Sequence, residues 1–338
     1  MNDQALLHVA ELSVQMPGPM GHVPVVEGVS FELPAGRALG VVGESGSGKT
    51  TTLRALLHLL PRGAMVTSGQ VSFDGVDLLA AQGEQLREIR GGKIGMIWQD
   101  PLAALDPVVR VGDQISEAAH AHIAPRWSDA RARARELMSL VELPDIERTY
   151  RCFPHELSGG QRQRVVIASA IAGSPRLLLA DEPTTALDVT VQDQVLKLLK
   201  RLRSELGLAL LLVSHDLAVV DQTCEDVAVM YAGRIVEAGP SRRVFASPRH
   251  HYTAGLLSAA PSVDHPGMRP FSIPGTPSMS VAMRGCAFAP RCPAADMRCI
   301  EETPVLRGDE HQSACHHPRN PGATTNIDQE VRHGASSP

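Results

Sequence analysis

A glycine-rich segment at residues 43–50 carries residue types that suit phosphate binding. Glycines let backbone N–H groups approach an anion closely, and the start of a following helix adds partial positive charge. Lys49 is long enough to reach the β- and γ-phosphates, and the Thr50 hydroxyl can bind magnesium. The pattern therefore predicts a nucleoside triphosphate site, to which we assign Gly43, Ser45, Gly46, Gly48, Lys49, Thr50 and Thr51.

Two adjacent carboxylates, Asp181 and Glu182, follow an apolar run that is typical of a strand. Alone, two acids at a strand end can simply face solvent. Downstream of the glycine segment, they suit phosphoryl chemistry, with Asp181 near a magnesium ion held by Thr50. Glu182 would then face the γ-phosphate and orient or deprotonate the attacking water. The pair predicts a hydrolytic site.

A second anion site is predicted where Ser158, Gly159, Gly160 and Gln161 open a helical pattern. One chain with one phosphate-binding loop has no evident need of two such sites. The economical solution is a dimer, in which the Ser158 turn of one chain covers the nucleotide held by the other.

Strand-like apolar runs alternate with helical patterns, which implies a largely parallel sheet covered on both faces. Short connections between the early runs suggest an antiparallel sheet beside it. We expect strands at 6–14, 25–33, 37–42, 69–73, 94–98, 177–180, 209–213, 227–231 and 234–237. We expect helices after the glycine segment and at 84–90, 112–121, 128–140, 158–172, 191–206 and 217–223.

The chain divides into three predicted parts. Residues 1–240 carry the α/β pattern, interrupted by a helical lobe at about 105–172. Residues 241–318 are rich in proline and lose the regular order of elements. Residues 319–338 are polar, and we expect them to be disordered.

Composition narrows the class of protein. With 43% hydrophobic residues in 338, a buried core is well supplied, and 3% aromatics make that core aliphatic. The formal charge of −5 argues against nucleic acid as the main partner. No apolar run approaches the ~20 residues needed to span a bilayer, and no secretory signal is evident. We therefore expect a cytosolic chain that can dock on a membrane protein.

Taken in order, these motifs resemble the ATP-binding subunit of ABC transporters over residues 5–240, with Leu157–Gln161 as that family's signature. The resemblance implies a P-loop NTPase core of mixed, mainly parallel sheet, with an antiparallel β subdomain and a helical subdomain. It implies that Gln99 contacts magnesium and the attacking water, and that His215 contacts the γ-phosphate. Residues 186–188, Ala-Leu-Asp, resemble the loop that crosses between protomers and ends at Asp188. Met16 stands where the family usually stacks an aromatic ring on adenine.

Further segments resemble the dipeptide/oligopeptide (peptide/nickel) importer branch. They are residues 99–107, 183–192, 251–257 and the cysteine-bearing tail. Asp106 replaces the asparagine that is commoner in that branch. The resemblance implies ATP-driven uptake of di- and oligopeptides. Nickel and glutathione importers share these motifs, so the cargo stays open.

The implied partners are two integral membrane permease subunits, a second homologous ATPase subunit in a heterodimer, and indirectly an extracytoplasmic substrate-binding protein. The implied location is the cytoplasmic face of the cell membrane. A soluble ABC-type ATPase of DNA repair or translation is the alternative. Such chains usually carry a long coiled coil or two ATPase modules, and neither is visible here.

Four cysteines, Cys286, Cys292, Cys299 and Cys315, crowd the tail with the spacing C-x5-C-x6-C-x15-C. In a reducing cytosol this favours a metal over disulfides. Four thiolates suit a 4Fe–4S cluster or zinc, and the spacing does not choose between them. We favour the cluster, with zinc and plain reduced cysteines as the two alternatives.

Overall fold

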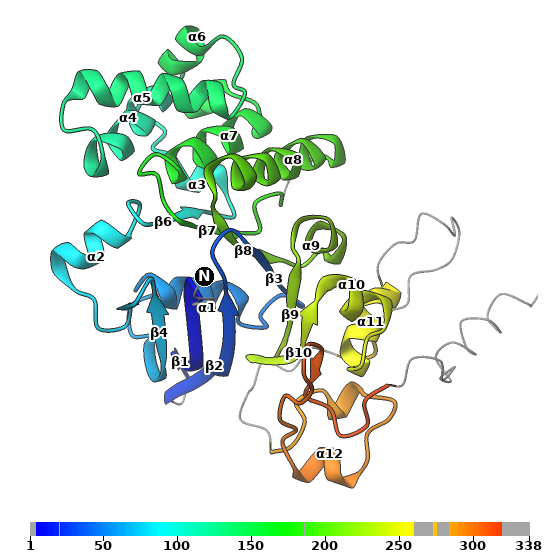
Figure 1. The fold of residues 1–338 in the computed structure, drawn as a ribbon. Helices are drawn as coiled ribbons and strands as arrows, with labels where there is room; N and C mark the ends of the chain where they lie inside the picture. Colours follow the sequence, from blue (N-terminus) through cyan, green and yellow to red (C-terminus); the bar gives the residue numbers. More distant parts are fainter. Residues whose placement is uncertain (1–4, 20, 186, 260–272, 276–283, 320–338) are drawn as a thin grey trace, which may run out of the picture.

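The computed structural model describes residues 5–19, 21–185, 187–259, 273–275 and 284–319 (Figure 1). Within them, seven strands form the main sheet in the order β11-β10-β9-β3-β8-β7-β6. The five from β9 to β6 are parallel, and β10 and β11 run antiparallel at one edge. They span Ala38–Val42 (β3), Ile94–Ile97 (β6), Leu177–Asp181 (β7), Ala209–Ser214 (β8), Asp226–Tyr231 (β9), Arg234–Pro240 (β10) and Gln312–Ser313 (β11).

Both faces of this sheet are buried, in two separate hydrophobic cores. In β3, Ala38 and Val42 belong to the core on the helical side, whereas Leu39 and Val41 belong to the opposite core. The same alternation holds in β7 and β8. Because successive strand side chains point to opposite faces, a continuous apolar run can supply both cores at once. The prediction of a mainly parallel sheet is confirmed.

The second sheet is antiparallel and has the order β2-β1-β4-β5. Its strands are Leu7–Gly18 (β1), Gly21–Leu33 (β2), Met65–Phe73 (β4) and Val76–Asp77 (β5). The pairing of β1 with β2 shifts register at several points, which indicates bulges in this long hairpin. The expected antiparallel sheet is confirmed, and its strands extend further than the predicted ranges.

Helices from both halves of the chain flank the main sheet. They are Lys49–Leu56 (α1), Gly83–Ile89 (α2), Val189–Leu206 (α8) and Leu217–Thr223 (α9). α8 buries Val195, Leu199 and Leu202, which recur at helical spacing. It ends at Gly207, whose positive φ of 65° gives a left-handed cap.

The helical region lies above one face of the main sheet (Figure 1). It comprises Pro101–Ala104 (α3), Val111–His122 (α4), Trp127–Leu140 (α5), Ile146–Arg151 (α6), the 3₁₀ turn Pro154–Glu156 (η1) and Gly159–Ala170 (α7). A side chain at Gly112 would overlap the Tyr150 ring, so α4 packs closely on α6. The short α6 is not visible in the sequence pattern.

Beyond Gly239 the expected loss of regular elements is wrong for the first twenty residues. Ser241–Ala246 (α10) and His251–Ala259 (α11) follow at once, and Ala289–Arg291 (η2) and Met297–Glu301 (α12) come later. β11 adds to the edge of the main sheet by pairing with β10. The boundary near residue 240 stays a prediction, and residues 320–338 of the predicted tail lie outside the described residues.

Candidate active site

The glycine segment forms the turn between β3 and α1, as its sequence context predicts. Gly43 and Gly48 have φ angles of 157° and 101°, in the region that glycine adopts most easily. A side chain on Gly43 would overlap the carbonyl oxygen of Met230 in β9. A side chain on Gly48 would lie 2.8 Å from the carbonyl oxygen of Val25 in β2. The loop is therefore packed between both sheets.

Lys49 begins α1 and is only 5% exposed. Its Nζ donates to the carbonyl oxygens of Gly43 (2.8 Å) and Glu44 (2.9 Å) and lies 3.4 Å from the Ser47 hydroxyl. Burial lowers the pKa of this amine, against the opposing effect of nearby carboxylates. The ammonium group is thus positioned at the mouth of the loop, where an anion would meet it. Ser45, Gly46 and Thr51 complete the turn and the first residues of α1.

Asp181 meets Thr50 as the sequence predicts. The Thr50 hydroxyl donates to Asp181 Oδ1 at 2.8 Å. Asp181 ends β7, and β8 lies between β7 and β3, so both residues stand at the carboxyl edge of the parallel sheet. Asp181 is 1% exposed, and burial raises the pKa of its carboxyl group. The two oxygens form a pair of the kind that binds magnesium.

Three side chains converge on Glu182 Oε2. Gln99 Nε2 donates at 3.2 Å, the Thr185 hydroxyl donates at 2.8 Å, and His215 Nδ1 lies at 3.1 Å. Glu182 has a positive φ of 47°, which is uncommon for a non-glycine residue, and its N–H donates to the carbonyl of Val213. The carboxylate is therefore held in one orientation by groups from three separate loops.

The sequence indicated Gln99 and His215 but not Thr185. Thr185 lies three residues after Glu182, a spacing that allows its hydroxyl to reach back to the carboxylate. Ala186 lies outside the described residues, so the predicted crossing loop is seen here only from Leu187 onward. Asp188 caps α8, because its side chain accepts a hydrogen bond from the N–H of Val191.

The Ser158 turn has the form of a capping box at the start of α7. The Ser158 hydroxyl accepts from the N–H of Gln161 at 3.3 Å, and the Gln161 side chain accepts from the N–H of Ser158 at 3.0 Å. Gly159 and Gly160 follow as the first helical residues. The turn opens α7, whose apolar residues pack in the core on the helical side, whereas α1, which Lys49 begins, contributes Leu53 and Leu56 to the opposite core.

Met16 lies near the end of β1, half-buried and paired with Val23 of β2. Two residues along β2, the Val25 carbonyl borders Gly48. The hairpin that carries Met16 therefore runs beside the glycine loop, and a role of Met16 in binding adenine stays a prediction.

The four tail cysteines gather in one place, and all six cysteines are free thiols. Besides burial, the neighbouring tail thiols contribute to raising the pKa of Cys286, Cys292 and Cys315, which indicates that the four lie close together. Burial raises the pKa of Cys286 and Cys299, and raises those of Cys292 and Cys315 to about 11. Sequence reasoning missed two neighbours: ligand atoms of Asp296, Cys299 and His317 lie within 4.8 Å of one another.

No helix in the described parts of the chain has the length and apolar character needed to cross a bilayer. Two family models match the sequence. Residues 26–185 match the one described as ABC transporter, and residues 236–299 match the C-terminal region of oligopeptide/dipeptide transporters.

Named relatives match along almost the whole chain. A protein of Brucella melitensis, named as a candidate peptide import ATP-binding protein, is 46% identical over 89% of this chain and 91% of its own length. The oligopeptide transport ATP-binding protein OppD is 43% identical in Escherichia coli K12 and in Bacillus subtilis 168. Each match covers 89% of this chain, and 89% and 85% of those two proteins respectively.

Solved structures show the same fold. The dimeric ATP-binding cassette MJ0796, in a post-hydrolysis state with ADP and Pi, superposes with a TM-score of 0.62 at 28% identity. That match covers 70% of this chain and 99% of the cassette. With two family models and relatives above 40% identity, the chain is an ABC transporter ATPase and belongs to the ATP-binding proteins of the oligopeptide/dipeptide import family.

Proposed function

We propose that this chain hydrolyses ATP to power the uptake of dipeptides and oligopeptides across the cell membrane. The arrangement around Glu182 is the observation that supports hydrolysis, since Gln99, Thr185 and His215 all address one carboxylate oxygen. The peptide cargo is supported by the match at residues 236–299 and by the names of the relatives. The same evidence favours an importer over the alternative of a soluble ATPase in DNA repair or translation.

The geometry suggests a division of roles. Lys49 and the glycine loop hold the β- and γ-phosphates, while Thr50, Asp181 and Gln99 offer oxygen ligands to magnesium. Magnesium would neutralise charge that develops on the phosphates. Glu182 accepts a proton from the water whose oxygen attacks the γ-phosphorus, and ADP leaves. Because all three contacts are to Oε2, we assign Oε1 to the water.

A second ATPase chain is part of the proposal. The Ser158 turn is a helix N-terminus with two glycines, and the helix it opens packs in the opposite core from α1, which Lys49 begins. Ser158, Gly160 and Asp188 of one chain would cover the nucleotide held by the partner, which we expect to be a homologous subunit. Hydrolysis would remove the bridging γ-phosphate and let the pair reopen.

Docking on two membrane-embedded permeases would place the chain on the cytoplasmic face of the membrane. A cavity of about 490 Å³ between β6 and the helical region supports this proposal. Its lining includes Trp98, immediately before Gln99, and Leu105 and Val109 a few residues after it. Two apolar side chains beside it, Leu102 and Val108, are 51% and 79% exposed. A permease segment that binds in this cavity would contact Trp98, and a shift of Trp98 would move the adjacent Gln99.

Substitution of Glu182 by glutamine tests hydrolysis. We expect the Glu182→Gln variant to bind Mg-ATP normally and to lose turnover at least 10²-fold, because the amide cannot take up the proton. Steady-state phosphate release, with the partner ATPase present, gives the rate. The exposed Glu205→Gln variant is the matched control and should retain wild-type turnover. Normal hydrolysis by Glu182→Gln would remove the assigned role.

We also propose that Cys286, Cys292, Cys299 and Cys315 hold a 4Fe–4S cluster, with zinc as the alternative. The donor set fits, because four free thiols lie within mutual electrostatic range. Their raised pKa values mean that a metal must displace protons from them. The group would supply cross-links in a segment of the chain that has little apolar core of its own.

Metal analysis decides between these possibilities. After anaerobic purification we expect about four iron and four sulfide per chain, with brown colour, as a 4Fe–4S cluster requires. One zinc per chain would support the alternative. The Cys299→Ser variant should lose the metal, whereas Cys152→Ser, outside the cluster, should keep it. A colourless, metal-free and folded wild-type protein would exclude both groups.

A further inference from the structure

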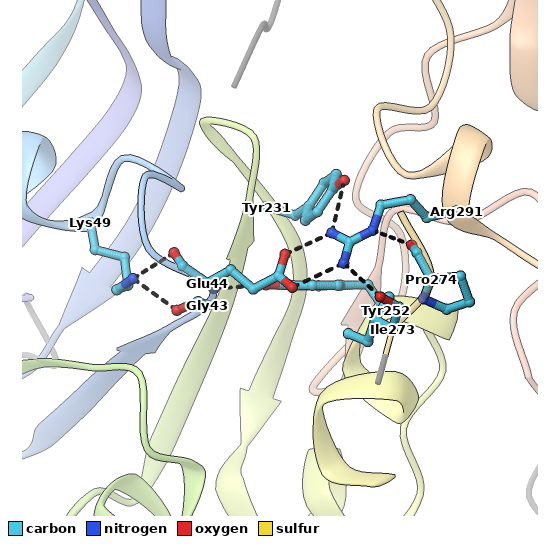
Figure 2. Close-up of polar contacts among 8 residues, drawn as sticks. All are labelled: Gly43, Glu44, Lys49, Tyr231, Tyr252, Ile273, Pro274 and Arg291. Carbon is cyan, nitrogen blue, oxygen red and sulfur yellow. Dashed lines mark hydrogen bonds and ion pairs between the residues drawn. The ribbon is translucent and has the colours of Figure 1, made fainter. Parts of the chain in front are cut away.

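A buried ion pair joins the cysteine-bearing segment to the glycine loop (Figure 2). Arg291, immediately before Cys292, forms two hydrogen bonds to the carboxylate of Glu44, at 2.7 Å and 3.0 Å. The two residues are 247 positions apart in the sequence. The side chains are 5% and 24% exposed, respectively. A two-pronged contact of this kind fixes both position and angle more tightly than a single hydrogen bond.

The surroundings of Arg291 leave its guanidinium little freedom. It also donates to the carbonyl oxygens of Pro274 (2.9 Å) and Ile273 (3.4 Å) and to the Tyr231 hydroxyl (3.4 Å). The group lies about 6 Å from the ring centres of Tyr231 and Phe288 (5.8 and 5.9 Å). The pKa of Arg291 is raised by its hydrogen bonds to Glu44, so the charge is permanent.

Glu44 is held from both sides. Its carbonyl oxygen accepts a hydrogen bond from the Lys49 ammonium group, while its carboxylate points the other way, toward Arg291 (Figure 2). Its N–H donates to the hydroxyl of Tyr252 in α11 at 2.8 Å. Tyr252 packs on Tyr231 and Phe288. Glu44 thus contacts α11 and the cysteine-bearing segment directly, and Arg291 links this contact to Tyr231 of β9.

We propose that Arg291 is a positioning residue for nucleotide binding, which holds the glycine loop through Glu44. The inference rests on nucleotide binding at that loop. Without Arg291, the carboxylate of Glu44 would be left partly buried and unneutralised, on the same residue whose carbonyl oxygen binds Lys49. That uncompensated charge would displace the loop and oppose the phosphates. Nucleotide affinity and the seating of residues 284–292 therefore depend on each other.

Mg-ADP binding to the full-length chain, measured by isothermal titration calorimetry, tests the inference. We expect Arg291→Gln to weaken binding about tenfold, which is ~1.4 kcal/mol. Arg291→Lys, which keeps the charge but not the two-pronged contact, should lose about threefold. The double variant Arg291→Gln/Glu44→Gln should return to within about threefold of wild type, because neither charge is then left unpaired.

Rescue by the second substitution separates positioning from a general structural role. If Arg291 only kept the cysteine-bearing segment folded, removing the Glu44 charge would not restore Mg-ADP binding. Arg298→Gln is the matched control, since Arg298 lies in the same segment and pairs with Glu302 on the surface. It should bind Mg-ADP as wild type does. Arg291→Gln binding within twofold of wild type, or a double variant no tighter than the single one, overturns the inference.

A reciprocal measurement requires no substitution in the cysteine-bearing segment. We expect Mg-ADP to slow hydrogen–deuterium exchange of backbone amides at residues 285–292 in the wild type, and the slowing to be much weaker in Glu44→Gln. Equal slowing in both overturns the inference. If neither the wild type nor the Lys49→Ala variant binds Mg-ADP, the nucleotide site itself is refuted instead.

Discussion

Adjacent carboxylates at the end of β7 have different surroundings. Asp181 is buried and accepts a single hydroxyl, from Thr50, whereas three side chains address Glu182. Burial raises the pKa of Asp181, so the folded protein without nucleotide holds this charge at a cost in free energy. Such a cost is typical of a position where function takes precedence over stability.

Substituting Asp181 by asparagine should therefore stabilise the nucleotide-free protein. We expect Asp181→Asn to raise the free energy of unfolding by about 1 kcal/mol near pH 7.5 and to abolish Mg-dependent hydrolysis. At pH values above its raised pKa, the Asp181 carboxyl group of the wild type is ionised, and its burial then lowers the free energy of unfolding. As the pH falls through that pKa toward the ordinary value of 3.8, the wild-type group is protonated and the difference disappears.

Urea unfolding of both proteins between pH 4 and pH 8 measures this difference. Asp193→Asn, which removes an exposed acid that pairs with Lys197 on α8, is the control. A destabilised Asp181→Asn variant at pH 7.5 would show that the charge stabilises the nucleotide-free fold.

At the scale of elements, periodicity predicted the long strands and helices because their burial is regular. The central strands β3, β7 and β8 are apolar at most positions, and their alternating side chains supply two cores. The shorter elements α6, α10, α12, β5 and β11 span between two and six residues, too few for a pattern to be distinguished. These elements form because neighbours from elsewhere in the chain hold them.

Elements also constrain one another at the glycine loop. Gly43 tolerates no side chain because β9 lies against it, and β9 comes almost 190 residues later in the chain. Gly36, in contrast, has a positive φ of 72° but no atom within 4 Å of a side chain. Both positions read simply as glycine in the sequence. Gly43 is required because β9 packs closely against it, whereas Gly36 is favoured only by the local turn.

At the scale of the whole molecule, the region after residue 240 is built into the ATPase core rather than merely attached to it. Glu237 of β10 is fully buried. Its carboxylate accepts the N–H groups of Arg249 (2.6 Å) and His250 (2.9 Å) and lies 2.7 Å from His311 Nε2. β11 pairs with the same strand. One buried acid thus joins β10, the start of α11 and the residue just before β11, between Cys299 and Cys315.

Truncation after Pro240 should consequently destabilise the core. This truncation removes all three partners of Glu237 and also Val244, Tyr252 and Phe288, which pack in the core with Tyr231 and Val236, at a cost of about 3–5 kcal/mol. For a domain of this size we expect a fall in Tm of ~10 °C or more. Truncation after Arg319 removes none of the contacts described here and should shift Tm by less than ~2 °C. Differential scanning calorimetry compares the two, and an unchanged Tm for the shorter chain would support an independent domain 1–240.

The sequence by itself determined the chemistry. The glycine segment, the paired carboxylates and the Ser158 turn are local patterns, whose residue types and spacing are required by phosphate, magnesium and helix N-termini. Tertiary structure alone decided which side chains meet: Thr185 and His215 on Glu182, and Arg291 on Glu44. The Arg291 contact depends on two segments 247 residues apart, and nothing in the local sequence of either one encodes the other. Burial favours this ion pair, because a charged side chain removed from water needs an oppositely charged group within hydrogen-bonding distance.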